Sequence, residues 1–416
     1  MTDSPVLTIE PLPACLTNPA LNAVLQTLPT ARLVGGVVRD TLLGRPVADI
    51  DLATPLLPDS VITALRDARI RVVPTGLDHG TVTAVVDGHG FEITTLRRDV
   101  ETDGRHAVVA FTTDWRTDAS RRDFTINAMS MTRDGAVFDY FGGVSDLRAG
   151  IVRFVGDAAT RIAEDYLRIL RFFRFFARYG RTEPDAATLS AIHAGVPGLL
   201  RLSAERVWRE LTKILSAPDP RRAIILMEAA GVIAAVVPEG ADAARVIQLI
   251  EAGAPADAGL RMAALLTGDP VTFADRLKLS GPERDRLLAL RHDAVPAPGS
   301  DDASLRRALA DTEPGVLIDR SWLVGGSSPG WAVLRDRIAA TPRPVFPLGG
   351  RDVVAIGVPP GPAVGTLLRD VRAWWLERGC MDDLVACRRK LMRSLRDTHA
   401  NMVGPSGHAT LPGTCP

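Results

Sequence analysis

The chain has very little lysine and no excess of charge of either sign. Only three of its 49 basic residues are lysines, at positions 213, 278 and 390, which leaves 46 arginines. The same number of acidic residues, 49, brings the formal net charge to zero. Nucleic-acid binding over the whole surface is therefore not indicated, and any such binding must come from local arginine clusters. Arginine favours planar, bidentate contacts with carboxylates and phosphates.

The chain also lacks a cysteine pattern, a signal segment and long apolar runs. Cys15, Cys380, Cys387 and Cys415 have no zinc-type spacing, which is typical of reduced thiols in a cytoplasmic protein. The first residues, MTDSPVLTIEPLPA, contain neither a basic nor an apolar segment, so we expect no signal peptide. No run approaches the roughly 20 apolar residues that cross a bilayer. We therefore expect a cytoplasmic location and no membrane partner.

The pattern of residues changes near position 150. At 416 residues and 46% hydrophobic content, the chain is too long for one ordinary domain. Up to position 150, short strand-like runs alternate with helical patterns. Beyond it, helical patterns broken by Pro and Gly dominate. We expect an α+β fold, with a small mixed β-sheet followed by a mostly helical remainder.

Residues 32–179 contain patterns typical of short strands and of helices. The turn at 87–90 predicts a hairpin between the two strands that flank it. The polar stretch 97–115 predicts a long loop, and such loops are usually functional or disordered. Expected strands are 32–35, 49–52, 71–74, 81–86, 91–95 and 137–140; expected helices are 37–43, 59–69, 121–132 and 158–179.

The stretch LVGGVVRDTLLGRPVADIDLAT, residues 33–54, contains two aspartates that plain packing would not need. Asp49 and Asp51 are two apart on an expected strand, so both side chains would leave the same face. Neighbouring carboxylates repel each other unless a cation lies between them, and oxygen ligands favour Mg²⁺ or Mn²⁺. Such a pair is the usual clamp for in-line nucleotidyl transfer. Two surface aspartates beside a turn are the alternative.

Gly35, Gly36 and Arg39, which precede this aspartate pair in the chain, are suited to binding a phosphate group. Gly35 and Gly36, between a strand and a helix, let the backbone approach a phosphate closely. Arg39 follows one helical turn later and can reach the same phosphates. Asp40 is expected to hold Arg39. Together with the aspartates, these residues predict a nucleotide-triphosphate and metal site.

The run RRDFTINAM, residues 121–129, provides a second set of polar residues. On the expected helix, Arg122 and Asn127 lie near one face. Arg122 could bind a triphosphate, and Asp123 or Asn127 a ribose hydroxyl. The alternative is the first turn of a helix with a cap and a surface arginine.

The run RIAEDYLRILRFFRFFARY, residues 161–179, provides a third set. Asp165, Arg168, Arg171 and Arg174 recur at three-residue steps and share a face, opposite an apolar stripe. A carboxylate beside a guanidinium offers one acceptor edge and one donor edge, which matches cytosine and adenine and mismatches guanine and uracil. Unpaired polar groups can produce a roughly 10⁴-fold discrimination. Arg171 and Arg174 would extend towards phosphate or base. A solvated helix face is the alternative.

These three runs, in this order, resemble the class II tRNA nucleotidyltransferase and bacterial poly(A) polymerase family, and LSAERVWRELTKIL (202–215) resembles its neck motif. The resemblance implies a nucleotidyltransferase head at 1–150, a base-recognising neck at 151–216, a body at 217–300 and a tRNA-binding tail at 301–416.

The resemblance also implies roles for individual residues. Asp49 and Asp51 would be the catalytic metal ligands, and Glu92 is a candidate third acidic group. Asp165 and Arg168 would form a protein template for CTP and ATP. Residues 97–115 would be a mobile loop needed for the change from C to A. The contacts to the nucleotide would include Gly36, Arg39, Arg122, Arg171 and Arg174.

The expected activity is template-independent addition or repair of the 3′-terminal CCA of tRNA, from CTP and ATP, with Mg²⁺ or possibly Mn²⁺. No protein partner is implied. The stretch VPTGLDHGTVTAVV (73–86) resembles the CCA-adding branch. A poly(A) polymerase or a partial enzyme adding only CC or only A is the alternative within the family. A non-catalytic RNA-binding relative is the alternative of another class. The tail cluster Arg388, Arg389 and Lys390 would contact tRNA or form a solvated face.

Overall fold

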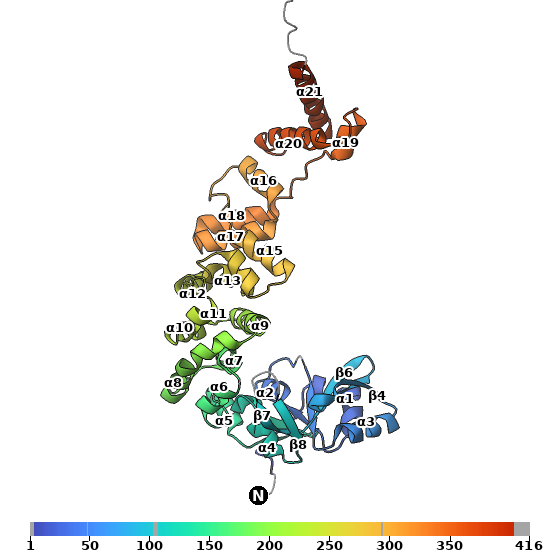
Figure 1. The fold of residues 1–416 in the computed structure, drawn as a ribbon, viewed down its shortest axis with the longest axis vertical. Coiled ribbons are helices and arrows are strands. Elements are labelled where there is room, and N and C mark those ends of the chain that lie inside the picture. Colours follow the sequence, from blue (N-terminus) through green and yellow to red (C-terminus); the bar gives the residue numbers. More distant parts are fainter. Residues whose placement is uncertain (1–3, 48, 103–106, 293, 403–416) are drawn as a thin grey trace, which may run out of the picture. The chain divides into compact units, whose positions relative to one another are not determined.

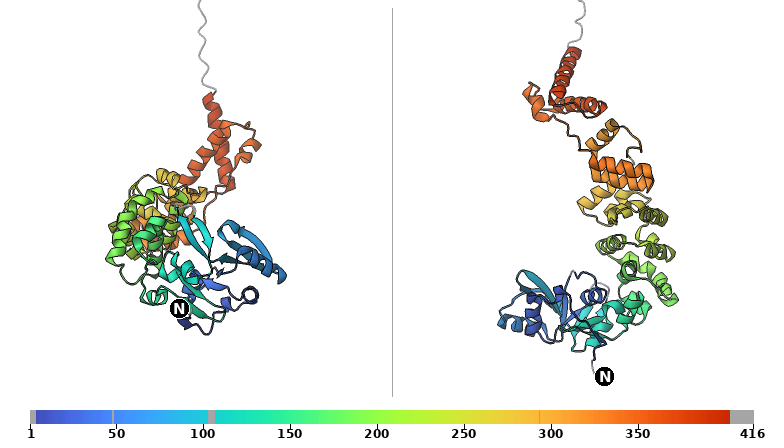
Figure 2. Two further views of the ribbon diagram at one scale, coloured as in Figure 1. Left: turned by 60° about the horizontal axis from the view of Figure 1, so that its bottom comes forward. Right: turned by 180° about the vertical axis from the view of Figure 1, so that it is seen from behind.

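The computed structural model describes residues 4–47, 49–102, 107–292 and 294–402. The chain divides into two compact units, one made by residues 1–247 and 256–280 and the other by 248–255 and 281–416. Strands lie in the blue-to-teal part of the chain and helices fill the rest of the drawn ribbon (Figure 1, Figure 2). Among the described residues, each helix is too short or too polar to span a bilayer. The boundaries of the four expected parts stay a prediction.

The first unit begins with the expected mixed sheet. Its strand order is β1-β10-β9-β2-β3-β6-β5-β4. The pair β3–β6 is parallel, and the other neighbouring pairs are antiparallel. The hairpin expected at 87–90 is confirmed by the pairing of Val86 with His89. The strands are β1 (Leu7–Thr8), β2 (Arg32–Val34), β3 (Asp51–Thr54), β4 (Arg71–Gly76), β5 (Thr81–Val86), β6 (His89–Thr95), β9 (Met129–Met131) and β10 (Ala136–Asp139).

Helices cover this sheet and bury its apolar side chains. The residues Leu33, Leu52, Ile93 and Met131, from four adjacent strands, are almost completely buried. Burial of such side chains contributes about 1.5–3 kcal/mol each, which fixes the strands that carry the polar residues described below. The helices of this part are α1 (Pro19–Thr27), α2 (Gly36–Leu42), α3 (Pro58–Asp67), α4 (Trp115–Ser120) and α5 (Gly143–Ala149).

The prediction of a loop at 97–115 is wrong over most of that range. Strands β7 (Arg97–Thr102) and β8 (Ala107–Phe111) form a separate two-stranded antiparallel sheet. Each strand satisfies the backbone groups of the other, so the hairpin forms without a regular apolar alternation. Phe111 lies against Gly80, where an added Cβ would be 2.6 Å from its ring. Residues 103–106 of the expected loop lie outside the described residues.

The helix expected at 121–132 is also wrong. A short 3₁₀ turn, η3 (Thr125–Asn127), is followed directly by β9. The Asp123 carboxylate accepts the Phe124 N–H at 2.9 Å, and local bonds of this kind compete with helix formation. The second expected strand is shifted as well. Because β3 begins at Asp51, Asp49 precedes the strand and does not lie on it.

The single helix expected at 158–179 consists of two helices, α6 (Ala158–Glu164) and α7 (Leu167–Tyr179). Asp165 separates them with extended backbone angles, φ −155° and ψ 106°. Its carboxylate accepts the Leu167 N–H at 3.1 Å, so Asp165 acts as a cap at the start of α7. The apolar stripe expected on this helix is confirmed; its members Leu167, Leu170, Phe173 and Phe176 are buried.

Further helices complete the first unit. Helix α9 packs against both α7 and α13. The buried Arg261 of α13 donates to the carbonyl oxygens of Leu215 at 2.6 Å and Ala217 at 2.5 Å, which caps the C-terminus of α9. The helices are α8 (Ala186–Gly195), α9 (Ala204–Leu215), α10 (Arg221–Ala229), α11 (Val232–Val236), α13 (Ala258–Leu265) and α14 (Pro270–Arg276), with α12 (Ala243–Glu251) shared between the units.

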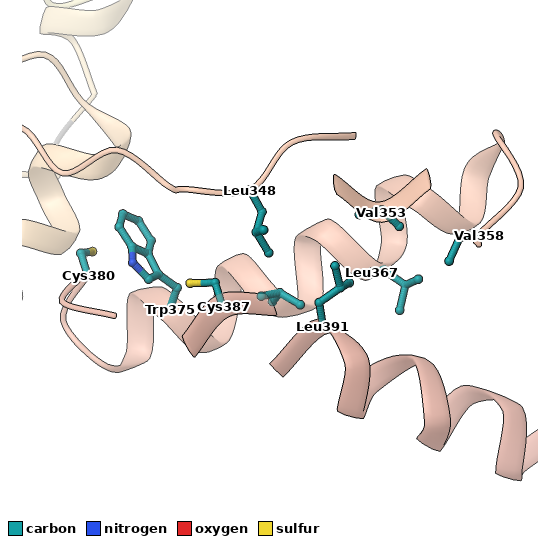
Figure 3. Packing of buried hydrophobic residues seen from close by; sticks show 9 residues of the cluster. Leu348, Val353, Val358, Leu367, Trp375, Cys380, Cys387 and Leu391 are labelled. Atoms are coloured by element: carbon teal, nitrogen blue, oxygen red, sulfur yellow. The ribbon is translucent and has the colours of Figure 1, made fainter. Parts of the chain in front are cut away.

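The second unit is helical in its described part and contains two small cores. One surrounds Leu309 and Leu334. The other surrounds Trp375, with Cys380, Cys387 and Leu391 packed beside it (Figure 3). Residues 403–416, at the end of the expected tail, lie outside the described residues. The helices are α15 (Gly281–Leu290), α16 (Asp302–Asp311), α17 (Pro314–Gly325), α18 (Pro329–Ala340), α19 (Gly350–Ala355), α20 (Pro362–Glu377) and α21 (Leu384–Met402).

Candidate active site

A cavity of about 750 Å³ in the first unit collects residues that are far apart in the sequence. Its walls come from β2, β3 and β6, from α2, from the segment around α4 and η3, and from α7 and α9. Of the predicted site residues, the cavity is lined by Gly35, Gly36, Arg39, Asp51, Arg122, Asp123, Asn127, Asp165, Arg168, Arg171 and Arg174. Asp49 lines a neighbouring cavity of about 440 Å³, which shares Asp51 and Glu92 with the larger one. The two cavities meet at these carboxylates.

Asp51 lies directly opposite Glu92, because β3 and β6 are parallel neighbours with these residues in register. Burial raises the pKa of Asp51, and the charges of Glu92 and Asp49 raise it further against the opposing effect of Arg122. Carboxylates that repel one another in this way are stabilised by a cation. Within the described ranges, no three His, Cys, Asp or Glu side chains gather closely enough to hold a metal ion alone. Mg²⁺ fits such a site, since it usually takes one or two carboxylates plus phosphate and water oxygens.

The glycine turn between β2 and α2 could not accept another residue without strain. Gly35 has φ 70° and ψ −121°, a conformation that residues with a Cβ rarely adopt. A Cβ there would also lie 3.1 Å from the Arg122 guanidinium. Gly35 therefore keeps the backbone close to Arg122 at the cavity wall.

Arg39 is held from two sides. It donates to both carboxylate oxygens of Asp40, at 3.1 and 2.9 Å, and to the Asn127 Oδ1 at 2.6 Å. The expected role of Asp40 in holding Arg39 is thus confirmed. Asn127 in turn donates to Asp123 Oδ1 at 3.1 Å, and Arg171 Nε donates to Asp123 Oδ2 at 2.8 Å.

Asp123 is the centre of this chain of contacts. Its burial would raise its pKa, but the Arg171 guanidinium and the Asn127 amide overcome this effect and lower the pKa below the ordinary value. Asp123 therefore stays ionised at neutral pH. Because its oxygens already accept bonds from Arg171, Asn127 and the Phe124 N–H, Asp123 chiefly organises its neighbours.

Asp165 and Arg168 line the same cavity, but each has a different protein partner. Arg206 of α9 donates to Asp165 Oδ2 at 2.6 Å. Arg168 pairs with Glu164 and donates to the Arg161 carbonyl oxygen at 2.8 Å. These partners hold the two side chains in place independently of each other.

Helix α9 contributes a second partner to α7. Glu210 is buried, and its Oε2 lies 2.8 Å from the Arg174 Nε. Burial lowers the pKa of Arg174, and Glu210 opposes that effect. Neither Arg206 nor Glu210 was singled out from the sequence. Their spacing of four in RVWREL, on a helix that follows an arginine-rich helix, is a signal that could have identified them.

Asp118 is buried and connects several groups beside the cavity. Its carboxylate accepts bonds from Arg121 at 2.8 and 3.0 Å, from Arg122 at 3.4 Å and from the Arg97 backbone N–H at 3.2 Å. Burial would raise its pKa, but Arg122 and Arg121 lower it overall. Asp118 thus joins the first residue of β7 to an arginine of the cavity.

Comparison with known proteins agrees with this geometry. Residues 31–153 match the family model "Poly A polymerase head domain", and residues 183–243 match "Probable RNA and SrmB- binding site of polymerase A". The CCA tRNA nucleotidyltransferase 1, mitochondrial, of Mus musculus is 38% identical over 362 residues, which cover 84% of this chain and 83% of that protein. The CCA-adding enzyme of Geobacillus thermodenitrificans is 39% identical over 203 residues, 48% of this chain and 49% of that enzyme.

The fold is also similar to solved structures. The Bacillus stearothermophilus CCA-adding enzyme in complex with CTP aligns with a TM-score of 0.73 at 28% identity, covering 92% of this chain and 100% of that one. The Thermotoga maritima CCA-adding enzyme shares the fold at a TM-score of 0.61 and 21% identity. The chain therefore belongs to the class II CCA-adding nucleotidyltransferase and poly(A) polymerase head domain family.

Proposed function

We propose that this chain adds or repairs the 3′-terminal CCA of tRNA, using CTP and ATP without a nucleic-acid template and releasing pyrophosphate. The observation that carries the proposal is that one cavity contains both Asp51 and the polar face of α7. A catalytic carboxylate and a set of base-selecting side chains thus face the same substrate space. Relatives that cover most of the chain are named for this activity.

Arginines of the cavity would bind the triphosphate. Arg39 and Arg122 lie beside the glycine turn, and Arg171 and Arg174 lie on α7. Because the guanidinium groups are held by carboxylates and amides, they are oriented before substrate arrives, which lowers the cost of binding. Their positive charge also stabilises the negative charge that moves onto the leaving pyrophosphate.

Asp49 and Asp51 would hold Mg²⁺, with Mn²⁺ as a substitute. When bound, such ions activate a 3′-hydroxyl and neutralise the leaving group. The side chains of Asp49 and Asp51 themselves place negative oxygens at the junction of the two cavities, and Glu92 lines both cavities on the strand next to Asp51.

The smaller cavity suits the acceptor RNA end. Among the residues that line it are Asn18 and His89, together with the carboxylates of Asp49 and Asp51. Its described lining contains no arginine or lysine, unlike the larger cavity, so a ribose fits it better than a triphosphate. A 3′-hydroxyl there would attack the α-phosphorus from the side opposite the leaving pyrophosphate.

Base selection would rest on Asp165 and Arg168. The carboxylate of Asp165 would accept the amino group of cytosine or adenine, and Arg168 would donate to the ring nitrogen. Arg206 and Glu164 hold these two side chains. Guanine and uracil would leave both edges unpaired, which is the more costly outcome in a partly buried site.

Two further proposals concern alternatives and location. A poly(A) polymerase or a partial enzyme would use the same cavity, so only product analysis separates them from CCA addition. A non-catalytic relative would need no carboxylate at the junction of the cavities. A cytoplasmic location is proposed from the sequence alone; the mouse and human relatives are named mitochondrial.

The test is incubation of the purified protein and Mg²⁺ with tRNA lacking its 3′ CCA, with each nucleoside triphosphate separately. We expect incorporation from CTP on this tRNA and from ATP only on tRNA ending in CC. Asp51→Asn should bind CTP and incorporate nothing. Long A tracts on generic RNA would instead identify a poly(A) polymerase, and absence of incorporation would favour the non-catalytic relative.

A further inference from the structure

Tyr179 links the end of helix α7 to helix α2. Its hydroxyl donates to Asp40 Oδ1 at 3.0 Å. Asp40 is the residue whose carboxylate binds Arg39 through two nitrogens. The last residue of the base-selecting helix is therefore in contact with the group that orients a phosphate-binding arginine.

The contacts continue from Arg39 back to α7 and form a closed circuit. Arg39 donates to Asn127 at 2.6 Å, Asn127 donates to Asp123 at 3.1 Å, and Arg171 donates to Asp123 at 2.8 Å. Arg171 and Tyr179 both belong to α7, about two helical turns apart. The circuit thus joins α2, the η3 segment and α7 through side chains alone.

The Tyr179 ring strengthens the same connection. The Arg39 guanidinium lies 4.4 Å from the ring centroid, and that of Arg45 lies 4.8 Å from it. Arg45 also donates to the Arg178 carbonyl oxygen near the end of α7, at 3.4 Å. Cation–π contacts at partly buried sites contribute about 0.5–2 kcal/mol each. The ring is thus fixed in a position from which its hydroxyl reaches Asp40.

We propose that Tyr179 is a positioning residue for triphosphate binding, because its hydroxyl holds Asp40 and thereby Arg39 at the cavity wall. The proposal rests on the proposed function, in which Arg39 contacts the triphosphate. Through Tyr179, the helix that selects the base also sets the position of the group that binds the phosphates.

Two features support a donor role for the hydroxyl. Burial raises the pKa of Tyr179, and Asp40 raises it further against the opposing charge of Arg39, so the hydroxyl remains protonated in neutral solution. Asp40 carries a carboxylate, which can only accept a hydrogen bond when ionised. The direction of the hydrogen bond, from the Tyr179 hydroxyl to the Asp40 carboxylate, therefore agrees with the charges of the two groups.

The test compares binding of CTP and CMP to the full-length Tyr179→Phe variant by titration calorimetry. In the proposed function the phosphates of CTP would reach Arg39, whereas CMP presents the same base with one phosphate. We expect CTP binding to weaken about five-fold, the value of one hydrogen bond of about 1 kcal/mol, while CMP binding is unchanged. The preference for CTP over UTP should stay as in the wild type.

Tyr140→Phe is the matched control. The Tyr140 hydroxyl accepts a bond from Arg32 at 3.3 Å and does not line the cavity, so its removal should not change either affinity. Asp40→Asn is a second variant, which should weaken CTP binding more than Tyr179→Phe because it also breaks the pair with Arg39.

Equal weakening of CTP and CMP in Tyr179→Phe would show a general structural role and overturn the proposal, as would unchanged binding of both. Failure of the proposed function is a separate result, because it would appear as absent or incorrect incorporation by the wild-type protein.

Discussion

At the residue scale, Gly35 is constrained by its own backbone and by its neighbour. Gly35→Ala adds a Cβ at φ 70° and 3.1 Å from Arg122, so strain of about 1–3 kcal/mol should appear in the free energy of unfolding. Displacement of Arg122 should raise the KM for CTP and ATP at least about ten-fold. Denaturant unfolding and steady-state kinetics measure the two effects.

Gly44→Ala is the control for this substitution. Gly44 also has a positive φ, 62°, but a Cβ there would meet nothing within 4 Å. It should cost about 1 kcal/mol of stability and leave KM unchanged. A rise in KM in both variants would mean that backbone strain alone, and not the contact with Arg122, affects the site.

Asp123 is predicted to give the protein a stability that depends on pH. Its pKa in the folded state is lowered, so its contribution is complete above the unfolded pKa of about 3.9 and is lost as pH falls through the folded value. Asp123→Asn removes the buried carboxylate that pairs with the half-buried Arg171, and the loss of these charged hydrogen bonds should cost about 1.5–3 kcal/mol at pH 7. Urea unfolding at pH 7 and at pH values below 4 checks whether the difference shrinks on acidification.

The control is Asp185→Asn, which alters an exposed carboxylate that caps α8. Asn is also a good cap, so stability should hardly change at either pH. If the Asp123→Asn deficit did not shrink in acid, the ionised carboxylate would not be the stabilising species.

At the scale of elements, the hairpin β7–β8 is attached to the cavity by Asp118. If the hairpin assists the change from C to A addition, Asp118→Asn should reduce addition of A to tRNA ending in CC about ten-fold more than addition of C. The reason is that an uncharged Asn side chain forms weaker hydrogen bonds than the Asp118 carboxylate with the Arg97 N–H and with Arg122. Single-turnover assays on the two tRNA substrates measure the two rates.

Asp114→Asn provides a control on the same helix. Asp114 caps α4 through the N–H groups of Arg116 and Thr117, and Asn can replace it in that role. Equal losses of C and A addition in Asp118→Asn would contradict a specific role of the hairpin.

Much of the sheet was predictable from local patterns. The strands near 71–76, 81–86 and 89–95 have regular apolar positions and a turn at 87–90, so tertiary contacts only confirm what their residues favour. The cavity is lined by glycines, arginines and aspartates from all three sequence runs that were expected to form the site.

The remaining elements depend on contacts that local patterns do not contain. The helical spacing of residues 158–179 continues through Asp165, but its side chain caps α7 and binds Arg206 forty-one positions later. The break therefore depends on a local cap together with a tertiary ion pair. Likewise, the segment 121–132 leaves the helix because Asp123 bonds its own neighbour and Arg171.

At the scale of the whole molecule, zero net charge makes RNA binding depend on local groups. Arg389 is exposed on α21, beside Arg388, which pairs with Asp352 at 2.9 Å. Replacing Arg389 and Lys390 together by Gln should weaken tRNA binding several-fold and lower the slope of log affinity against log salt by about 1 per lost phosphate contact. Filter binding at several salt concentrations measures both quantities.

CTP binding by this variant should be unchanged, since the cavity lies in the other unit. Arg378→Gln is the control, because Arg378 is already paired with Asp382 at 2.7 Å. Unchanged tRNA affinity in the double variant would identify the α21 cluster as a solvated face.

We propose that one cavity selects C, C and then A without a template. The most direct measurement is the mass of tRNA lacking its CCA end after incubation with the protein, Mg²⁺ and all four nucleoside triphosphates at equal concentration. We expect a single product extended by two C residues and one A. Incorporated G or U, or extension by a run of A, would contradict it.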